Sequence, residues 1–131
     1  MSLHGAQTDR TYDRAGLGSP VRRGERPVIV VVDLSIGFTD PARPTGADLT
    51  DVVAATAALV EAGRPAGVPV VWTTIAYTPA ELDTVVWLDK VPGMRALTVG
   101  SAAADLDPRL PVTEADHVNV KQGATAFSGT E

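Results

Sequence analysis

The chain contains no cysteine among its 131 residues. Disulfide bonds, thiolate metal ligands and a cysteine nucleophile are therefore excluded within it. Positive charge is also scarce, since 11 Lys and Arg face 16 Asp and Glu for a net charge of −5. Because phosphate binding needs a basic patch, nucleic acid is not an expected partner. No apolar run approaches the roughly 18 residues of a membrane span, and residues 1–23 lack the apolar core of a secretory signal. We expect a cytoplasmic protein without a membrane partner.

The composition otherwise fits one globular domain. Apolar residues make up 44% of the chain, which is ordinary for a folded protein of this size. Residues 1–26 are polar and rich in Gly and Arg, so we expect an N-terminal arm there. This arm is either disordered or docked on a surface through the segment 12–16. Residues 27–131 are expected to form the domain.

An unbroken apolar run marks the first strand. Five consecutive β-branched residues, 28–32, precede Asp33 directly. A run without polar alternation predicts a strand buried on both faces, as in a parallel sheet. Open α/β sheets bind ligands outside the carboxyl ends of their strands, which makes Asp33 a candidate functional residue. The alternative is that Asp33 caps the next turn or helix.

Further patterns predict an α/β fold with a mainly parallel sheet. The segment 48–63 has apolar residues at helical spacing and ends near Gly63 and Pro65. Strand, helix and strand in this length form a βαβ unit. The remaining expected elements are strands at 67–74 and 117–121, a short helix at 80–88 and a single helical turn at 107–110.

The strand expected at 117–121 ends with Lys121. Its carboxyl end would lie at the same edge of the sheet as Asp33. Such a pair is either a structural salt bridge or a general base beside a cation that tunes a nucleophile. The residues alone leave both interpretations open.

Three motifs follow one another at a characteristic spacing. They are Val-Val-Asp-Leu-x-x-Gly-Phe-x-Asp-Pro at 31–41, Ala-Gly-Val-Pro-Val-Val-x-Thr-Thr at 66–74, and Val-Lys-Gln-Gly-Ala-Thr-Ala-Phe-Ser-Gly-Thr at 120–130. In this order they resemble the isochorismatase-like cysteine hydrolases. The segments Tyr-Asp-Arg-Ala-Gly at 12–16 and Lys-Val-Pro-Gly at 90–93 are most similar to the N-carbamoylsarcosine amidohydrolase branch, which includes maleamate-type amidases.

This resemblance implies a Rossmann-like three-layer α/β sandwich and a Cys-Asp-Lys triad. The family hydrolyses a small amide or carbamoyl compound and releases ammonia. Asp33 matches the aspartate that takes the thiol proton. Lys121 matches the lysine that favours the thiolate, in keeping with the lowering of a thiol pKa by a nearby cation. No cofactor is implied.

Substrate contacts are expected from four residues: Phe38, Trp87, Thr125 and Phe127. Tyr77 is a further aromatic candidate. The alternatives are packing or a subunit contact for Tyr77 and Trp87, and a cap on a helix starting near residue 126 for Thr125. Family members that bind a metal use Asp and His residues after the second strand. The segment 75–83 has no histidine, so we expect no metal there or at the isolated His4 and His117.

One departure from the family is decisive. The family's cysteine follows a further βα unit after the lysine, whereas only ten residues follow Lys121 here. A βαβ unit needs roughly 30 residues. We therefore expect 27–131 to be the N-terminal part of the hydrolase domain, inactive alone and completed by a cysteine-bearing C-terminal segment. The alternative is a non-catalytic relative that binds a ligand or a sister subunit. By resemblance the protein is a homo-oligomer with a small-molecule amide substrate.

Overall fold

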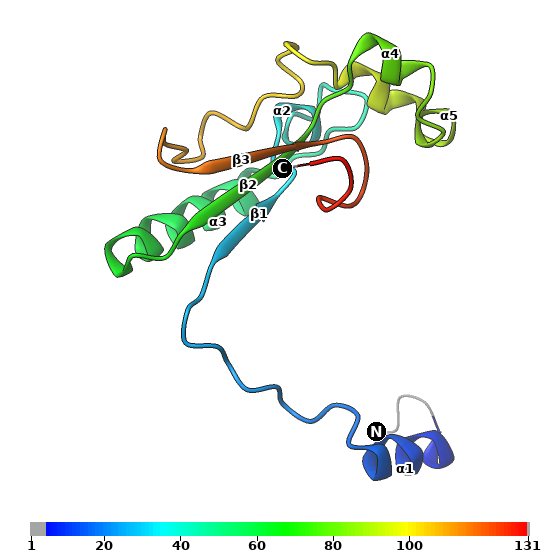
Figure 1. The fold of residues 1–131 in the computed structure, drawn as a ribbon, viewed down its shortest axis with the longest axis vertical. Coiled ribbons are helices and arrows are strands. Elements are labelled where there is room, and N and C mark those ends of the chain that lie inside the picture. The colour runs from blue at the N-terminus through cyan, green and yellow to red at the C-terminus, as the bar shows by residue number, and fades with distance from the viewer. Residues whose placement is uncertain (1–4, 131) are drawn as a thin grey trace.

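A parallel sheet of three strands forms the centre of the computed structural model, which describes residues 5–130 (Figure 1). The strand order is β1-β2-β3, and both neighbouring pairs are parallel. The strands are β1 (Ile29–Val32), β2 (Val70–Ile75) and β3 (His117–Lys121). Each lies at or close to a range predicted from the apolar runs. The predicted α/β class with a parallel sheet is confirmed.

Helix α3 (Thr50–Gly63) covers one face of this sheet (Figure 1). Strand side chains alternate between the two faces, and the register pairs Val31 with Trp72. Together with Val53 and Val60 of α3, these two residues belong to the main apolar cluster. Removal of this apolar surface from water is the main force that holds α3 on the sheet.

The opposite face of β1 is open. Val30 and Val32 are 54% and 59% exposed, while Val31 between them is buried. The predicted burial of this strand on both faces is therefore wrong in the described residues. A continuous run of valines suits a strand covered on both sides, but it does not determine whether a second layer packs there.

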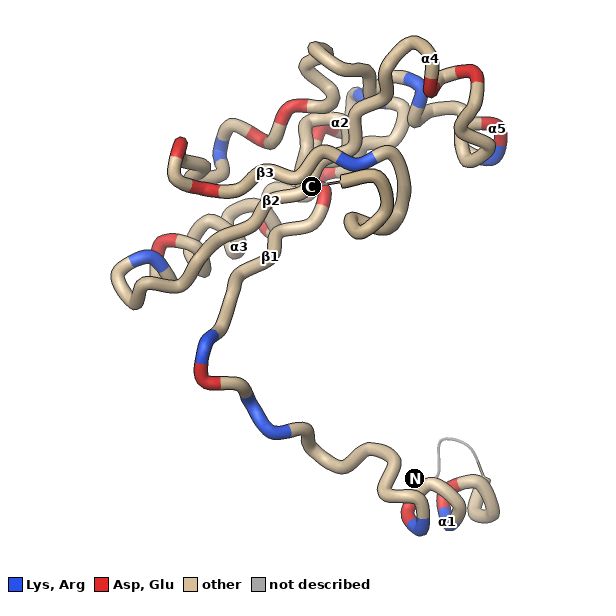
Figure 2. The backbone as a smooth tube through the Cα atoms, viewed as in Figure 1, with Lys and Arg blue, Asp and Glu red and all other residues tan. Residues whose placement is uncertain are grey.

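The same face of the sheet is buried farther along β2 and at the end of β3, where it carries two polar residues that matter for the site, Thr73 and Lys121. Thr73, Ile75 and Lys121 share it, because the register pairs Ile75 with Lys121 and alternation places Thr73 on the same side as Ile75. Among the described strands Lys121 is the only residue with a Lys, Arg, Asp or Glu side chain. Figure 2 shows that the other charges lie mostly on helices and connections.

The predicted helix at 48–63 forms with a later start. Asp48 lies before it and accepts a hydrogen bond from the backbone N–H of Thr50 at 3.1 Å. The helix ends at Gly63 as predicted and continues into a 3₁₀ turn, η1 (Arg64–Ala66), that contains Pro65. Of the predicted apolar stripe only Val53 and Val60 are buried.

The segment between β2 and β3 differs most from expectation. The single helix predicted at 80–88 is wrong: two one-turn helices form, α4 (Pro79–Leu82) and α5 (Trp87–Lys90). The four residues between them, 83–86, are Asp, Thr, Val and Val, which are weak helix formers. A 3₁₀ helix, η2 (Pro92–Ala96), follows. These turns pack on a second apolar cluster composed of Ile75, Tyr77, Leu88, Met94, Leu97 and Ala103.

The helical turn predicted at 107–110 is only a hydrogen-bonded turn. The N–H of Leu110 donates to the carbonyl of Asp107 at 3.0 Å. The Asp107 carboxylate accepts the N–H of Arg109 at 2.9 Å, a local side-chain bond that favours a turn over a helix. A short helix, α2 (Ile36–Thr39), follows β1 in the chain.

The N-terminal arm contains a helix that was not predicted. Helix α1 (Ala6–Ala15) has Gly16 as its C-cap and contains no buried residue. It stands apart from the sheet, and an extended connection leads from it to β1 (Figure 1). Within residues 5–130, no helix combines the length and the hydropathy that a bilayer span requires.

Candidate active site

Asp33 and Lys121 form a partly buried ion pair at the carboxyl edge of the sheet. The Lys121 ammonium donates to Asp33 Oδ2 at 2.7 Å and to the Gly123 carbonyl at 2.9 Å. The Lys121 side chain is 2% exposed and that of Asp33 is 22% exposed. A lysine buried to this degree needs a charged or hydrogen-bonding partner. The pair therefore has restricted access to water, and Asp33 is its more open end.

Thr73 of the central strand binds the same carboxylate. Its hydroxyl donates to Asp33 Oδ1 at 2.7 Å, so each oxygen of Asp33 has its own donor. The backbone N–H of Asp33 also points back to β2, to the Thr73 carbonyl at 3.1 Å. Thr73 was not among the predicted site residues. No local sequence pattern indicated it, because the contact follows from the register that pairs Thr73 with Val32, one residue before Asp33.

The backbone of Asp33 has a rare conformation. With φ at 58° it is the only non-glycine residue with positive φ among those described. Such a residue outside glycine carries strain, although Asp tolerates it better than most. The alternative role of Asp33 as a helix cap is not seen, because Ser35 occupies the N-cap position of α2. Both carboxylate oxygens instead bind side chains from β2 and β3.

Two of the four predicted substrate contacts lie against neighbouring structure. Phe38 of α2 is partly buried and packs on the second apolar cluster. Trp87 begins α5, where its indole N–H approaches the Met94 sulfur at 3.1 Å. The Lys90 ammonium lies 5.2 Å from the centre of the Trp87 ring. The observed contacts of Trp87 are thus within the α5–η2 region, and a substrate role for either residue stays a prediction.

The other two predicted contacts follow Lys121. Phe127 is 98% exposed, and its backbone N–H donates to the Thr125 hydroxyl at 3.2 Å. No helix starts near residue 126 in the described structure, so Thr125 supports a turn. The structure therefore does not bring the Phe127 ring to the Asp33–Lys121 pair. Its role in substrate binding also stays a prediction.

Tyr77 lies in the core. It is fully buried in the second apolar cluster, and its hydroxyl has no hydrogen-bond partner among the described residues. Burial, with smaller effects from the charges of Glu81 and Asp33, raises the pKa of the phenol. The packing interpretation of Tyr77 therefore fits the structure.

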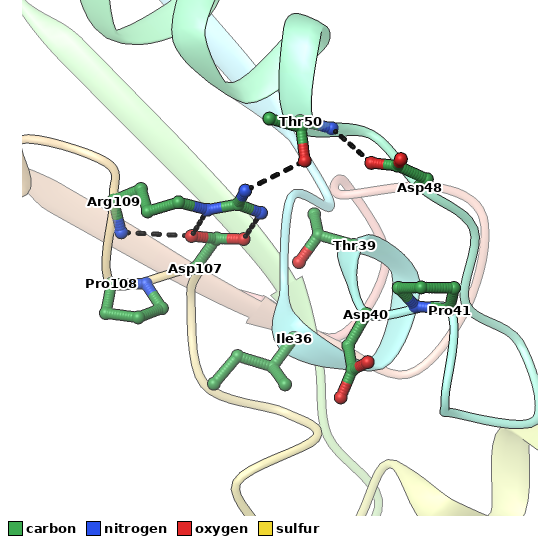
Figure 3. A pocket seen from close by; sticks show the side chains of 9 residues that line it. All are labelled: Ile36, Thr39, Asp40, Pro41, Asp48, Thr50, Asp107, Pro108 and Arg109. Atoms are coloured by element: carbon green, nitrogen blue, oxygen red, sulfur yellow. Dashed lines mark hydrogen bonds and ion pairs between the residues drawn. The ribbon is translucent and has the colours of Figure 1, made fainter.

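A separate cavity of about 510 Å³ lies between α2, the start of α3 and the turn at 107–109 (Figure 3). Its main feature is a bidentate pair in which Arg109 donates to the two Asp107 oxygens at 2.9 and 2.6 Å. Arg109 also donates to the Thr50 hydroxyl at 3.1 Å. The Arg109 hydrogen bonds hold the pKa of the Asp107 carboxyl far below its ordinary value. These contacts join the turn to α3 and leave the buried carboxylate satisfied.

No metal centre is evident in the part of the chain that the structure describes. Residues 5–130 contain no group of three or more His, Asp or Glu side chains arranged to hold an ion. His117 is exposed at the start of β3, and His4 lies outside the described residues. The absence of a metal remains a prediction from the sequence.

Residues 27–131 match the isochorismatase domain family. The chain belongs to the isochorismatase family. This confirms the resemblance drawn from the three motifs. The N-carbamoylsarcosine amidase of an Arthrobacter species is 29% identical over 125 residues, which cover 91% of this chain and 47% of that protein. The maleamate amidohydrolase of Pseudomonas putida is 30% identical over 127 residues, covering 95% of this chain and 60% of that protein. The chain thus spans about half the length of these relatives.

Solved structures of isochorismatase-family proteins share the fold of this chain. A cysteine hydrolase from Pseudomonas syringae superposes with a TM-score of 0.73 at 21% identity, over 86% of this chain and 56% of that one. The N-carbamoylsarcosine amidase from Thermoplasma acidophilum gives a TM-score of 0.63 at 22% identity, over 80% of this chain and 57% of that one. At these identities the likeness shows the fold. The chemistry of the site must be argued from its own residues.

Proposed function

We propose that this isochorismatase-family chain supplies the base and the lysine of an amide hydrolase site. The observation that supports the proposal most directly is the 2.7 Å contact between Lys121 and Asp33, on a lysine that is 2% exposed. A purely structural salt bridge gains little from such burial, because removal of both charges from water costs about as much as their attraction returns. The family relationship and the names of the two curated relatives favour amide hydrolysis.

The proposed reaction uses a thiol from a cysteine-bearing segment outside residues 1–131. Asp33 takes the thiol proton: the S–H bond breaks, an O–H bond forms and the electron pair stays on sulfur. Lys121 favours the thiolate and stabilises the negative charge that develops. The thiolate attacks the carbonyl carbon of a small amide or carbamoyl compound, and ammonia leaves with the proton from Asp33. Water then cleaves the thioester.

Substrate selectivity is assigned to residues around this pair. Phe38, Trp87, Thr125 and Phe127 are proposed to wall the pocket once the cysteine-bearing segment is in place, and the substrate is proposed to resemble N-carbamoylsarcosine or maleamate. The open valine face of β1 offers apolar surface for that segment. The functional protein is proposed to be a homo-oligomer.

The test is to assemble the chain with a cysteine-bearing segment that completes an isochorismatase-family domain, and to measure ammonia release from N-carbamoylsarcosine and from maleamate. Asp33→Asn and Lys121→Ala are each expected to lower kcat by about 10²-fold or more, the range for loss of a positioned base. Circular dichroism checks that the variants stay folded. Normal turnover in either variant would refute the roles assigned to these residues.

The same experiment decides the competing function. If the wild-type assembly binds the small amides without releasing ammonia, the chain is a non-catalytic module that binds a ligand or a sister subunit. Mass spectrometry of the purified protein provides an independent check. It asks whether a cysteine-bearing polypeptide is isolated together with this chain.

A further inference from the structure

Thr73 holds the Asp33 carboxylate from the side opposite Lys121. The two donors bind different oxygens, each at 2.7 Å. Rotation of the carboxylate about its Cβ–Cγ bond by less than a half-turn would break both contacts. The orientation of the carboxylate is therefore determined jointly by β2 and β3, and neither Lys121 nor Thr73 alone determines it.

The central strand makes Thr73 a rigid support. Thr73 is buried, and its register partners are Val32 on β1 and Asn119 on β3. Threonine is branched at Cβ, so few orientations of its hydroxyl are open in a strand. A buried strand interior also moves less than a loop, and a site held by such elements keeps a more exact geometry.

The same residue holds the unusual backbone of Asp33. The Asp33 N–H faces the Thr73 carbonyl at 3.1 Å and the Thr73 hydroxyl oxygen at 3.2 Å. These contacts act on the residue whose φ of 58° is unfavourable for a side chain. Strained conformations persist where the surrounding structure determines them, and here Thr73 contributes two contacts to the Asp33 backbone.

We propose that Thr73 is a positioning residue, which aligns the Asp33 carboxylate to receive the thiol proton; this inference depends on the proposed hydrolase function. When the Thr73 hydroxyl donates to Oδ1 and Lys121 donates to Oδ2, each oxygen retains lone pairs that can accept the proton. Displacement of a reacting group by about 1 Å can cost about 10²-fold in rate. Loss of the hydroxyl is expected to reduce the rate without removing the base.

The chain offers a matched control at the next position. Thr74 is also buried in β2, but it lies on the opposite face and donates to the Ala104 carbonyl at 2.6 Å. Thr74→Val removes a buried hydroxyl without touching Asp33. Thr73→Val removes the hydroxyl that binds Asp33 and keeps the branched shape, whereas Thr73→Ser keeps the hydroxyl and loses the methyl group.

The first measurement is the NMR chemical shift of the Asp33 carboxyl ¹³C in this chain, which needs no catalysis. We expect Thr73→Val to change this chemical shift, and Thr73→Ser and Thr74→Val to leave it close to the wild-type value. An unshifted signal in Thr73→Val would overturn the inference. This result does not depend on whether the protein is a hydrolase.

The second measurement is turnover by the assembly with the cysteine-bearing segment. Thr73→Val is expected to lower kcat by about 10- to 100-fold with KM within about twofold, and Thr73→Ser to recover most of the rate. A kcat for Thr73→Val equal to that of Thr74→Val would overturn the inference even if the carboxyl signal had shifted. No ammonia from the wild-type assembly would refute the proposed function and with it a role of Thr73 in proton transfer, while the carboxyl signal would still show whether Thr73 orients the Asp33 carboxylate.

Discussion

Lys121 Nζ lies 2.7 Å from Asp33 Oδ2, although 88 positions separate the two residues in the chain. The contact spans the end of β2, which lies between β1, the strand that Asp33 follows, and β3, the strand that ends with Lys121. Lys121 is the more buried partner, and its remaining bond is to the Gly123 carbonyl.

The first prediction concerns the unequal burial of the pair. Asp33→Asn leaves an ammonium with a 2% exposed side chain without its carboxylate, and we expect a loss of about 3 kcal/mol in the free energy of unfolding. Lys121→Met leaves a carboxylate that still binds Thr73 and reaches water, so its cost is expected to be smaller. Urea denaturation of both variants measures the difference.

The double variant completes the test of this pair. Asp33→Asn with Lys121→Met removes both charges, and its loss of stability is expected to be smaller than the sum of the single losses by about 1 kcal/mol or more. Strict additivity would mean that the two side chains do not interact energetically in the folded protein.

The second prediction concerns acid stability. Hydrogen bonds from Arg64 hold the pKa of Asp116 far below its ordinary value, and those from Arg109 do the same for Asp107. At pH values between the folded and unfolded pKa the unfolded chain binds more protons. The stabilisation by these carboxylates is therefore complete above about pH 4 and is lost progressively as the pH falls below it.

Asp116→Asn tests this dependence. It is expected to lower stability near pH 7 and to flatten the fall in stability below pH 4, as measured by urea midpoints at a series of pH values. Asp89→Asn is the control, because its ion pair with Arg95 lies on the surface and contributes little. If the stability of Asp116→Asn falls as steeply below pH 4 as that of the wild type, the prediction is contradicted.

The third prediction concerns the glycine of the first motif. Gly37 donates its N–H to the Ala103 carbonyl at 2.8 Å, and an added Cβ at Gly37 would lie 2.8 Å from the same oxygen and strike Leu97. Gly37→Ala is expected to cost about 1–3 kcal/mol through overpacking, seen as a lower midpoint of thermal unfolding. Gly24→Ala is the matched control, because nothing lies within 4 Å of its added Cβ. Equal midpoints in the two variants would rule out the close approach.

The fourth prediction concerns the two faces of β1. Val30→Thr places a hydroxyl on the open face and is expected to change the free energy of unfolding by no more than about 0.5 kcal/mol. Val31→Thr places the same hydroxyl against α3 and is expected to cost about 1–3 kcal/mol. Chemical denaturation compares the two. A large loss in Val30→Thr would show that a further layer covers this face in solution.

The sequence predicted the positions of the first and third strands closely. The third strand begins and ends at the predicted residues, His117 and Lys121, and the first differs by one residue. The short helix at 80–88 was wrong because residues with weak helix propensity interrupt it, and a second apolar cluster orders the two turns instead. Local patterns predict well where they are long and regular, and poorly where tertiary contacts arrange short turns.

The sequence by itself determined the parallel α/β architecture, the family, and the placement of Asp33 and Lys121 at strand ends, because runs of apolar residues and ordered motifs are local properties of the chain. Only the tertiary structure decided that Thr73 binds Asp33, that Val30 faces away from α3, and that Tyr77 packs in an apolar cluster. These facts depend on the register between strands and on which surfaces meet. Segments far apart in the chain determine both, and no single stretch of residues encodes them.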